Sequence, residues 1–387
     1  MQFEKPKDVR AAVMVKPGHM EIRSYPYPSI DDDSAIVKME MSGICGTDKH
    51  LYKGETTQPL GDTPFPILNG HENVGTIVEI GKNAAKNLEG DCKELKVGDR
   101  ITVGVEVNCG ECWFCRNQWD AVACNNQDFA YGCWPTCDEP PHIRGGWSEY
   151  MYIGPKSKVF KIPENMSNEL AMLTEEMAVA HISLNKAMRS YPIIKDGFGL
   201  GDSVAVIGNG PLGLLHGMMA RILGADRMIA TDLADRRLEM AKTCYADFTI
   251  NASETTPEER AQKIRDLTEG RGVDLAIETA GTPQGFVEAL EVVRRGGTVL
   301  ELVNWVYVED AHINVMRLIT MKNLHIHGLM SCGLKWGPVI ELLNRYSDRY
   351  PFEKIISHQM SLDEVVKNMD IVIDPNKTTK VVVVPHK

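Results

Sequence analysis

The sequence predicts an α/β protein in which a β-rich part is followed by a doubly wound parallel sheet and a short return segment. Three observations lead to this prediction. Residues 1–165 contain short β-branched runs separated by glycine, proline and acidic turn signals. Residues 166–338 alternate between strand-like and helix-like stretches. A glycine-rich turn joins the first strand and the first helix of that alternation.

The first part, residues 1–165, is typical of a distorted barrel of short strands. The apolar runs that indicate strands are AAVMV, AIVKMEMSG, VGTIVEIG, RITVGVEV and EYMYI. The stretch QDFAYGCWPTCDEPPHIR is irregular and contains prolines, so we expect it to form a surface loop.

The second part, residues 166–338, begins with a predicted helix, SNELAMLTEEMAVAHISLNKAM, whose apolar residues recur at helical spacing. Six strands then alternate with helices: SVAVIG, RMIATD, FTIN, VDLAIET, TVLELV and LHIHGL. Such alternation implies a doubly wound parallel sheet. Residues 339–387 read as a helix, a mixed segment and a final strand, which we expect to pack back on the first part.

The composition indicates a folded globular protein and argues against several classes of partner. The chain has 387 residues, of which 43% are hydrophobic and 25% charged, as in a folded protein with a sizeable core. A formal net charge of −11 without basic blocks argues against nucleic acid or anionic membranes as partners. The first residues have no signal-peptide pattern, and glycines and a proline interrupt the uncharged stretch 203–220. We therefore expect a cytoplasmic protein without a membrane span.

The stretch VAVIGNGPLG has the order G-x-G-x-x-G between an apolar strand and an amphipathic helix. The first glycine permits a tight turn, the second lets the backbone approach a pyrophosphate, and the third lets helix and strand pack closely. The helix N-terminus offers unpaired N–H groups to phosphates. The predicted cofactor-binding residues of this turn are Gly208, Asn209, Gly210, Pro211, Leu212 and Gly213.

Asp232 ends the next strand, where its carboxylate can hold both ribose hydroxyls and repel a 2′-phosphate. NAD is therefore favoured over NADP. Arg236 and Arg237 follow closely and weaken this preference slightly, and we include Arg237 among the cofactor-binding residues. The alternative is a glycine-rich turn that binds no nucleotide.

Four of the ten cysteines, Cys109, Cys112, Cys115 and Cys124, lie in the stretch CGECWFCRNQWDAVAC. In a long chain without an export signal, such bunching favours metal binding over disulfides. Four thiolates can enclose a tetrahedral zinc ion with no open position, which makes a structural site. Two alternatives stay open: an iron–sulfur cluster and four unrelated buried cysteines.

The stretches GICGTDKH and NGHENVG suggest a second metal site. Cys45 is a soft ligand, the hydroxyl of Thr47 can pass protons, and His50 can receive them. Neighbours in an extended segment point to opposite faces, so we expect His71 as a ligand and Glu72 as a carboxylate behind it that can swing inward. Such a sulfur–nitrogen site still needs one or two ligands. The alternative is that these residues are ordinary core residues.

These motifs together resemble the zinc-dependent medium-chain dehydrogenases, the superfamily of alcohol, sorbitol and threonine dehydrogenases. The matching stretches, in the family's order, are GICGTDKH, GHENVGTIVEIG, VGDRITV, the cysteine cluster, GGWSEYMYI, TEEMAVAHISL, VAVIGNGPLGLL and TDLADRRLEMAK. The resemblance covers essentially the whole chain. It implies a GroES-like catalytic domain (1–165), a Rossmann NAD-binding domain (166–338) and a C-terminal return to the catalytic domain (339–387).

The resemblance also implies roles for particular residues. Cys45 and His71 would be catalytic zinc ligands with Glu72 beside them, and Thr47 and His50 would form the proton relay. Glu175 matches the acidic residue that the polyol-oxidising branch has near the metal, and Glu176 stands where proline is usual. The alternative for both glutamates is a solvated first helical turn.

This chain departs from the family pattern in several places, two of which concern its cysteines. One extra residue separates Cys115 from Cys124, and the insertion that carries Cys133 and Cys137 is long. That insertion could reshape the substrate mouth or a contact between subunits.

The resemblance therefore implies an oxidoreductase with two zinc ions per chain, one catalytic and one structural. It would transfer hydride between NAD and a secondary alcohol of the polyol, sugar or cyclitol class. Simple alcohols and amino alcohols such as threonine stay open as substrates. A zinc-free reductase on the same fold and a non-catalytic nucleotide sensor or scaffold also stay open. The family implies a homodimer or homotetramer.

Overall fold

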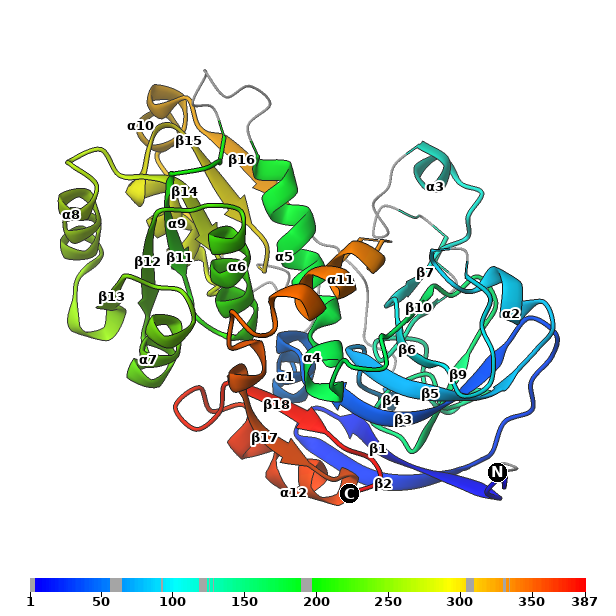
Figure 1. Ribbon diagram of the computed structural model, residues 1–387. Helices are drawn as coiled ribbons and strands as arrows, with labels where there is room; N and C mark the ends of the chain where they lie inside the picture. Colours follow the sequence, from blue (N-terminus) through cyan, green and yellow to red (C-terminus); the bar gives the residue numbers. More distant parts are fainter. Residues whose placement is uncertain are drawn as a thin grey trace.

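The computed structural model describes residues 4–55, 65–91, 93–117, 124, 126–127, 129–188, 197–303, 310–329, 332–333 and 335–387. It confirms the predicted α/β class, with a β-rich part next to a six-stranded parallel sheet flanked by helices (Figure 1). Among the described residues, every helix is too short or too polar to cross a membrane.

A seven-stranded sheet organises the β-rich part. Its order is β10 (Val159–Lys161), β6 (Arg100–Val103), β5 (Asn73–Ile80), β3 (Ala35–Gly43), β18 (Lys380–Val383) and β17 (Ile356–Met360), with β9 (Tyr150–Ile153) also paired to β3. The central strand β3 is mostly buried, because neighbouring layers cover both of its faces. The sheet therefore holds the end of β3 firmly, and Cys45 follows shortly after that end.

Smaller elements complete this part. A three-stranded sheet has the order β2 (His19–Pro26), β1 (Asp8–Lys16) and β4 (Ile67–Leu68), and β7 (Glu106–Val107) pairs with β8 (Phe129–Ala130). The helices are α1 (Gly46–Lys53), α2 (Ala84–Asn87), α3 (Trp113–Asn117) and α4 (Asn168–Met172). In Figure 1, α1 lies between the two parts of the molecule.

The C-terminal segment returns to the first sheet. β18 runs antiparallel to β3, with Val382 opposite Gly43, and β17 pairs with β18 in parallel. The helix α12 (Leu362–Val372) packs on β1 and β2. Red strands therefore lie among blue ones in Figure 1. This pairing agrees with the expected return of 339–387, while the boundaries at 165 and 338 stay a prediction.

The second sheet is entirely parallel. Its order is β13 (Phe248–Asn251), β12 (Arg227–Asp232), β11 (Ser203–Ile207), β14 (Val273–Glu278), β15 (Val293–Glu301) and β16 (His325–Gly328). In chain order this is 3-2-1-4-5-6, the doubly wound arrangement. The topology reverses between β11 and β14, so a crevice is expected at the carboxyl ends of these two strands.

Helices cover both faces of this sheet. They are α5 (Thr174–Ala187), α6 (Pro211–Ile222), α7 (Asp235–Cys244), α8 (Pro257–Leu267), α9 (Pro283–Val292) and α10 (Val315–Leu318), with short 3-10 turns η2 (Ala252–Glu254) and η3 (Thr320–Lys322). Alternate residues of β11 enter different cores: Val204 and Val206 pack on the side of α5 and α6, whereas Ala205 and Ile207 pack on the side of α8 and α9. This alternation follows from the two-residue period of a strand.

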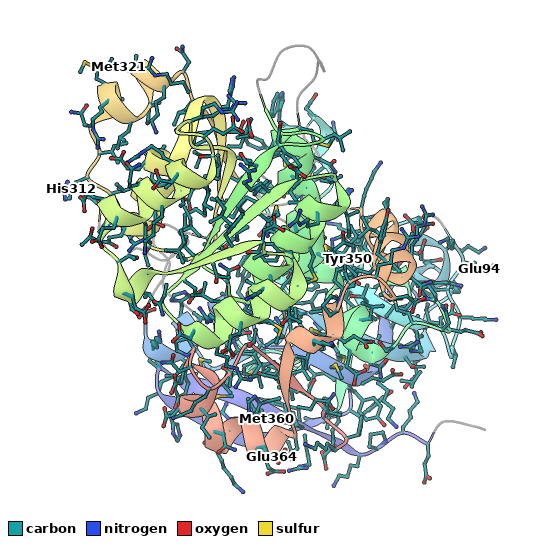
Figure 2. All side chains as sticks on the ribbon, turned by 60° about the vertical axis from the view of Figure 1, so that its left-hand side comes forward. Glu94, His312, Met321, Tyr350, Met360 and Glu364 are labelled. Atoms are coloured by element: carbon teal, nitrogen blue, oxygen red, sulfur yellow. The ribbon has the colours of Figure 1, made fainter. Side chains whose placement is uncertain are left out.

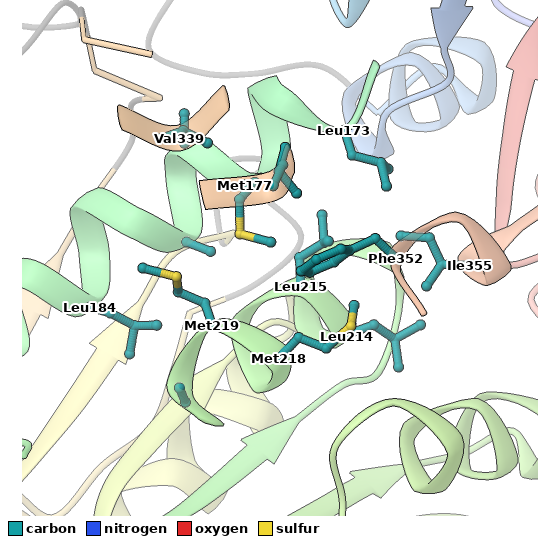
Figure 3. Close-up of a cluster of buried hydrophobic side chains, with 14 of the residues drawn as sticks. Leu173, Met177, Leu184, Leu214, Leu215, Met218, Met219, Val339, Phe352 and Ile355 are labelled. Carbon is teal, nitrogen blue, oxygen red and sulfur yellow. The ribbon is translucent and has the colours of Figure 1, made fainter. Parts of the chain in front are cut away.

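Figure 3 shows the apolar cluster between α5 and α6. Met177 and Leu184 of α5 lie beside Met218 and Met219 of α6. α11 (Gly337–Tyr346) and the 3-10 turn η4 (Phe352–Ile355) also contribute to the cluster, through Val339, Phe352 and Ile355. The chain that leads back to the first sheet is therefore anchored on the helices of the second.

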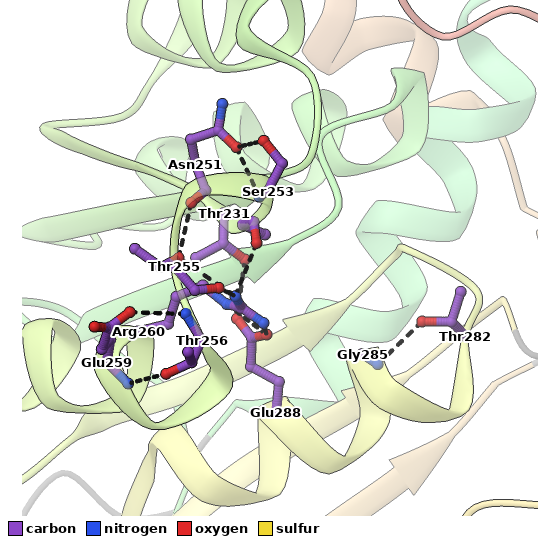
Figure 4. Close-up of polar contacts among 11 residues, drawn as sticks. Thr231, Asn251, Ser253, Thr255, Thr256, Glu259, Arg260, Thr282, Gly285 and Glu288 are labelled. Carbon is purple, nitrogen blue, oxygen red and sulfur yellow. Dashed lines mark hydrogen bonds and ion pairs between the residues drawn. The ribbon is translucent and has the colours of Figure 1, made fainter.

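On the other face, polar contacts fix α8 and α9 (Figure 4). Thr256 caps α8 by accepting from the backbone N–H of Glu259, and Thr282 caps α9. A buried ion pair of 2.7 Å joins Arg260 of α8 to Glu288 of α9. Figure 2 draws the side chains of the described residues, with Met321 and His312 near one end of the molecule and Met360 and Glu364 near the other.

Candidate active site

The loop that carries Cys45 is tied to the loop that carries His71. Cys45 precedes the first residue of α1, and its backbone N–H donates to the Asp48 carboxylate over 2.9 Å. The side-chain amide of Asn69 donates to the other oxygen of Asp48, also over 2.9 Å. Asp48 and Asn69 are buried, so this pair of hydrogen bonds positions the two loops. Our sequence reasoning missed both residues, although an acid in a helix's first turn is a capping signal.

The ligand atoms of Cys45, His71 and Glu72 lie within 4.8 Å of one another. The expected separation of His71 and Glu72 onto opposite faces does not hold, because the backbone here is not extended. Gly70 has a φ of 99° and Glu72 lies in a bend, and together they turn both side chains to the same side.

Behind this cluster is a buried lysine that sequence reasoning missed. Lys380 of β18 is fully buried and pairs with Glu72 and, over 3.2 Å, with Glu176. Burial alone would lower the pKa of Lys380, but the charges of Glu176 and Glu72 outweigh it and raise that pKa. Burial is the main reason that the pKa of Glu176 rises to about 7, and Lys380 opposes this rise.

Glu175 is 9% exposed and lines the same cavity, so the solvated-turn interpretation of Glu175 and Glu176 is wrong. Burial, followed by the charges of Glu72 and Glu176, raises the pKa of Glu175 to about 8, although His71 opposes the rise. Glu175 stands outside the group whose ligand atoms are mutually within 4.8 Å. Glu72 therefore lies closer to Cys45 and His71 than Glu175 does.

The donor set suits a divalent cation. A thiol, an imidazole and carboxylates are zinc ligands, and Glu72 Oε1 is buried without a hydrogen-bond partner among the described residues. Burial raises the pKa of the Cys45 thiol, so its thiolate needs a neighbouring positive charge. Lys380 offsets only part of the buried acidic charge, and a dication would balance the remainder.

Thr47 and His50 lie on α1 beside the cluster. Thr47 Oγ1 is 3.8 Å from Cys45 Sγ, and both residues line the cavity. His50 is one turn further along, on the same helix face, with its side chain 33% exposed and its Nδ1 paired to Glu55. The two residues thus lie on one face of α1, with Thr47 nearer the cluster and His50 paired to Glu55.

The glycine turn has the geometry that the sequence predicts. Gly208 has a φ of 87°, and a Cβ there would lie 2.5 Å from the backbone nitrogen of Ala280. A Cβ on Gly213 would overlap the carbonyl oxygen of Gly208, which explains the close packing of α6 on β11. In contrast, the nearest atom to a Cβ on Gly210 is 3.9 Å away, in the Arg237 guanidinium. Gly210 therefore faces open space where a ligand can approach.

Asp232 and Asn209 hold this turn in place through hydrogen bonds. The backbone N–H of Asn209 donates to Asp232 Oδ2 over 2.6 Å, and an Arg237 nitrogen lies 3.7 Å from the same oxygen. The side chain of Asn209 is buried and bonds to Tyr245 and to the carbonyl oxygen of Thr231. Asn209 thus acts on the turn's shape, while Pro211 and Leu212 begin α6 at the edge of the cavity.

A single cavity of about 530 Å³ joins the two groups of residues. It extends from Cys45, His71 and Glu175 to Gly210 and Arg237. Its walls include residues that follow the carboxyl ends of β14 and β15, namely Thr279, Ala280, Gly281, Leu302 and Val303. The cavity therefore lies at the topological switch point of the parallel sheet. Sequence reasoning missed these wall residues, although they lie at the end of two predicted strands or directly after one.

The insertion with Cys133 and Cys137 is not the surface loop that we expected. Phe129, Tyr131 and Cys137 are buried, and Cys133 lines the cavity with its sulfur 3.8 Å from His71 Nδ1. Phe129 and Tyr131 of this segment pack in the core beside β9 and β5. The prolines and polar residues of the segment obscured this burial in the sequence. The insertion therefore contributes Ala130, Cys133 and Trp134 to the cavity wall, while its expected effect on the substrate mouth stays a prediction.

The other four cysteines also come together. Their sulfurs lie 3.8 Å apart for Cys109 and Cys115, 3.5 Å for Cys112 and Cys115, 3.9 Å for Cys112 and Cys124, and 3.6 Å for Cys109 and Cys124. A tetrahedral zinc ion with Zn–S distances of about 2.3 Å requires sulfurs roughly 3.8 Å apart. The extra residue before Cys124 does not keep its sulfur out of this group.

Comparison with known proteins agrees with this geometry. Residues 31–164 match the alcohol dehydrogenase GroES-like domain, and residues 211–345 match the zinc-binding dehydrogenase domain. A sorbitol dehydrogenase of Bacillus subtilis is 30% identical over 100% of both chains. The chain belongs to the zinc-dependent medium-chain dehydrogenases.

Other members share the whole length of this dehydrogenase. An L-threonine 3-dehydrogenase of Pyrococcus horikoshii is 30% identical over 96% of this chain and 97% of its own. The crystal structure of an alcohol dehydrogenase of Thermotoga maritima superposes with a TM-score of 0.85 at 29% identity, covering 98% of this dehydrogenase and 99% of that chain. The names of these relatives refer to different alcohols, so the family does not by itself define the substrate.

Proposed function

We propose that this dehydrogenase oxidises a secondary alcohol of the polyol, sugar or cyclitol class and transfers the hydride to NAD. The observation that carries the proposal is the single cavity that joins Cys45, His71 and Glu175 to Gly210 and Arg237. Hydride can pass from the substrate to the nicotinamide ring only when the metal cluster and the dinucleotide turn open into the same cavity.

Cys45, His71 and Glu72 would hold the catalytic zinc ion, with Glu175 beside them. The zinc ion supplies a Lewis acid that lowers the pKa of a bound hydroxyl group. Thr47 accepts the hydroxyl proton of the substrate while its own hydroxyl proton passes on toward His50, and His50 releases a proton to solvent. Removal of this proton favours departure of hydride from the carbon. The cavity walls orient the substrate and exclude water.

Cys109, Cys112, Cys115 and Cys124 would hold a second, structural zinc ion. Their four sulfurs already supply the four ligands of a tetrahedral site, which leaves no position open for a substrate. The preference for NAD over NADP rests on Asp232, whose carboxylate would repel a 2′-phosphate, while Arg237 would weaken that repulsion.

The polyol class is supported by Glu175, which stands where simple alcohol dehydrogenases have a third thiolate ligand. Glu106 and Glu176 are further carboxylates in the cavity wall. Carboxylates accept hydrogen bonds from several hydroxyl groups, whereas an apolar wall would favour simple alcohols.

A substrate screen tests this proposal. Polyols, inositols, sugar acids, threonine and simple alcohols would be offered with NAD or NADP, and reduction followed by absorbance. We expect NAD-dependent turnover, fastest with a polyhydroxylated substrate. Cys45→Ser should abolish turnover and leave NADH binding nearly intact. Normal turnover in that variant would refute the metal assignment. If turnover were fastest with threonine, the substrate would be an amino alcohol and not a polyol, sugar or cyclitol.

We also propose a homodimer or homotetramer. β16 ends the sheet order, and its residues are largely exposed within the described part of the chain. The consecutive elements α10, η3 and β16 carry exposed apolar side chains, namely Val315, Met316, Met321 and Ile326. A single-chain mass in light scattering would contradict this proposal. The cytoplasmic location stays a prediction.

A further inference from the structure

Lys49 occupies a position between the metal cluster and the dinucleotide turn. It belongs to α1, one residue before His50, and lines the same cavity as Gly210 and Arg237. Its side chain is only partly exposed. Lys49 therefore borders the cavity that also contains Cys45 and His71 at its wall.

The charges around Lys49 leave it without a partner. Lys380 pairs with Glu72 and Glu176, Arg237 lies 3.7 Å from Asp232, and His50 pairs with Glu55. Among the residues that the structure describes, Lys49 has no ion pair or side-chain hydrogen bond. Burial first, and then the positive charges of Lys380 and Arg237, lower the pKa of Lys49 to about 8, while Cys45 and Glu176 oppose this. Its ammonium group therefore lacks an anion.

The opposite wall of the cavity is built for an anion. α6 is 12 residues long and begins at Pro211, so its first N–H groups and its positive dipole end face the space in front of Gly210. The Arg237 guanidinium borders that space, 3.9 Å from where a Cβ of Gly210 would stand. A phosphate group here would have cationic groups on two sides.

The other end of the cavity repels phosphate. Glu106 lies 3.7 Å from Cys332, and the charges of Glu106 and Glu175 both raise the pKa of that thiol after burial does. Two carboxylates at the substrate end disfavour a phosphorylated substrate there. The anionic partner of Lys49 is therefore expected to be a phosphate group of the dinucleotide and not part of the substrate.

We propose that Lys49 binds the pyrophosphate of the dinucleotide from the side of the metal-binding part, opposite Arg237 and the N-terminus of α6. This inference rests on the proposed NAD dependence. It makes Lys49 a cofactor-binding residue that links the two parts of the molecule through the bound nucleotide.

The test compares nucleotide affinities of three variants with those of the wild type. Lys49→Met removes the charge and Lys49→Arg keeps it. Lys86→Met makes the same change at an exposed helical site outside the cavity. Dissociation constants for NADH are measured by fluorescence, and those for ADP-ribose and adenosine by calorimetry. Thermal unfolding and zinc content show whether each variant is intact.

We expect Lys49→Met to weaken NADH and ADP-ribose binding at least about tenfold, as for one lost charge-assisted hydrogen bond. Adenosine, which has no phosphate, should bind equally to all proteins. Lys49→Arg should recover most of the affinity, and Lys86→Met should match the wild type.

Two results would overturn the inference while the proposed function stands. One is NADH affinity within twofold of wild type in Lys49→Met. The other is an equal loss of adenosine affinity, which would indicate general damage to the cavity. A wild-type protein that binds neither NADH nor ADP-ribose would overturn the proposed NAD dependence itself, and the inference with it.

Discussion

The three glycines of the dinucleotide turn serve different physical purposes. Gly208 is required by its positive φ and by the backbone of Ala280, and Gly213 by the carbonyl oxygen of Gly208. Gly210 has an ordinary φ of −65° and no close neighbour. Only a ligand gives Gly210 a reason to lack a side chain.

This difference predicts opposite outcomes for two alanine variants. Gly210→Ala should fold with wild-type stability, since its backbone suits alanine, but should bind NADH at least about tenfold more weakly because the methyl group occupies phosphate space. Gly208→Ala should lose more than about 1 kcal/mol of unfolding free energy. Chemical denaturation and NADH fluorescence measure both effects. Unchanged NADH affinity in Gly210→Ala would place the pyrophosphate elsewhere.

At the residue scale, the sequence predicted those site residues that stand in an unusual local sequence pattern. A cysteine between glycines and a glycine-rich turn are visible in the sequence itself, so Cys45 and Gly210 were found. Lys380 was missed because a lysine before four valines resembles the exposed start of a strand. Its burial depends on Glu72 and Glu176, which are far away in sequence.

At the scale of elements, a buried histidine joins α5 and α6. His216 of α6 is completely buried; its Nδ1 donates to the Leu212 carbonyl oxygen over 2.8 Å, and its Nε2 lies 2.9 Å from Ser183 Oγ of α5. Burial lowers the pKa of His216 to about 4. The folded protein thus holds this ring in its neutral form.

A pH dependence of stability follows from this depressed pKa. Below about pH 6.5 the unfolded chain protonates this histidine while the folded protein does not, so stability falls by about 1.4 kcal/mol per pH unit down to about pH 4. His216→Gln removes this contribution. Denaturation of both proteins at about pH 7 and about pH 5.5, which straddle the unfolded pKa, should show a smaller loss in the variant. Identical losses would contradict the assignment, and effects shared by both proteins, such as metal loss, cancel in the comparison.

The elements of the parallel sheet were predictable because strand-like stretches, such as the apolar runs SVAVIG and VDLAIET, alternate with helical patterns. The insertion near Cys133 was wrongly assigned to the surface, since prolines and polar residues hid buried aromatics such as Tyr131. Strands of two residues, such as β4 and β8, have no sequence signal of their own and exist only through their partners.

At the scale of the whole molecule, the active site forms only because the C-terminal segment returns to the first sheet and because residues of both sheets meet at one cavity. β18 brings Lys380 to the end of β3, next to Cys45, and α11 and η4 pack on α5 and α6. The cavity between the two parts then joins metal cluster and dinucleotide turn. No local pattern predicts such a junction, because it arises from contacts between segments that are far apart along the chain.

The central claim is that Cys45 and His71 hold a cation of their own, separate from the cation of the four-cysteine group. The most direct test is the zinc content per chain, measured by elemental analysis on wild type and Cys45→Ser under the same purification. We expect two zinc ions in the wild type and one in a folded Cys45→Ser protein. Two zinc ions in that variant, or one in the wild type, would contradict this claim.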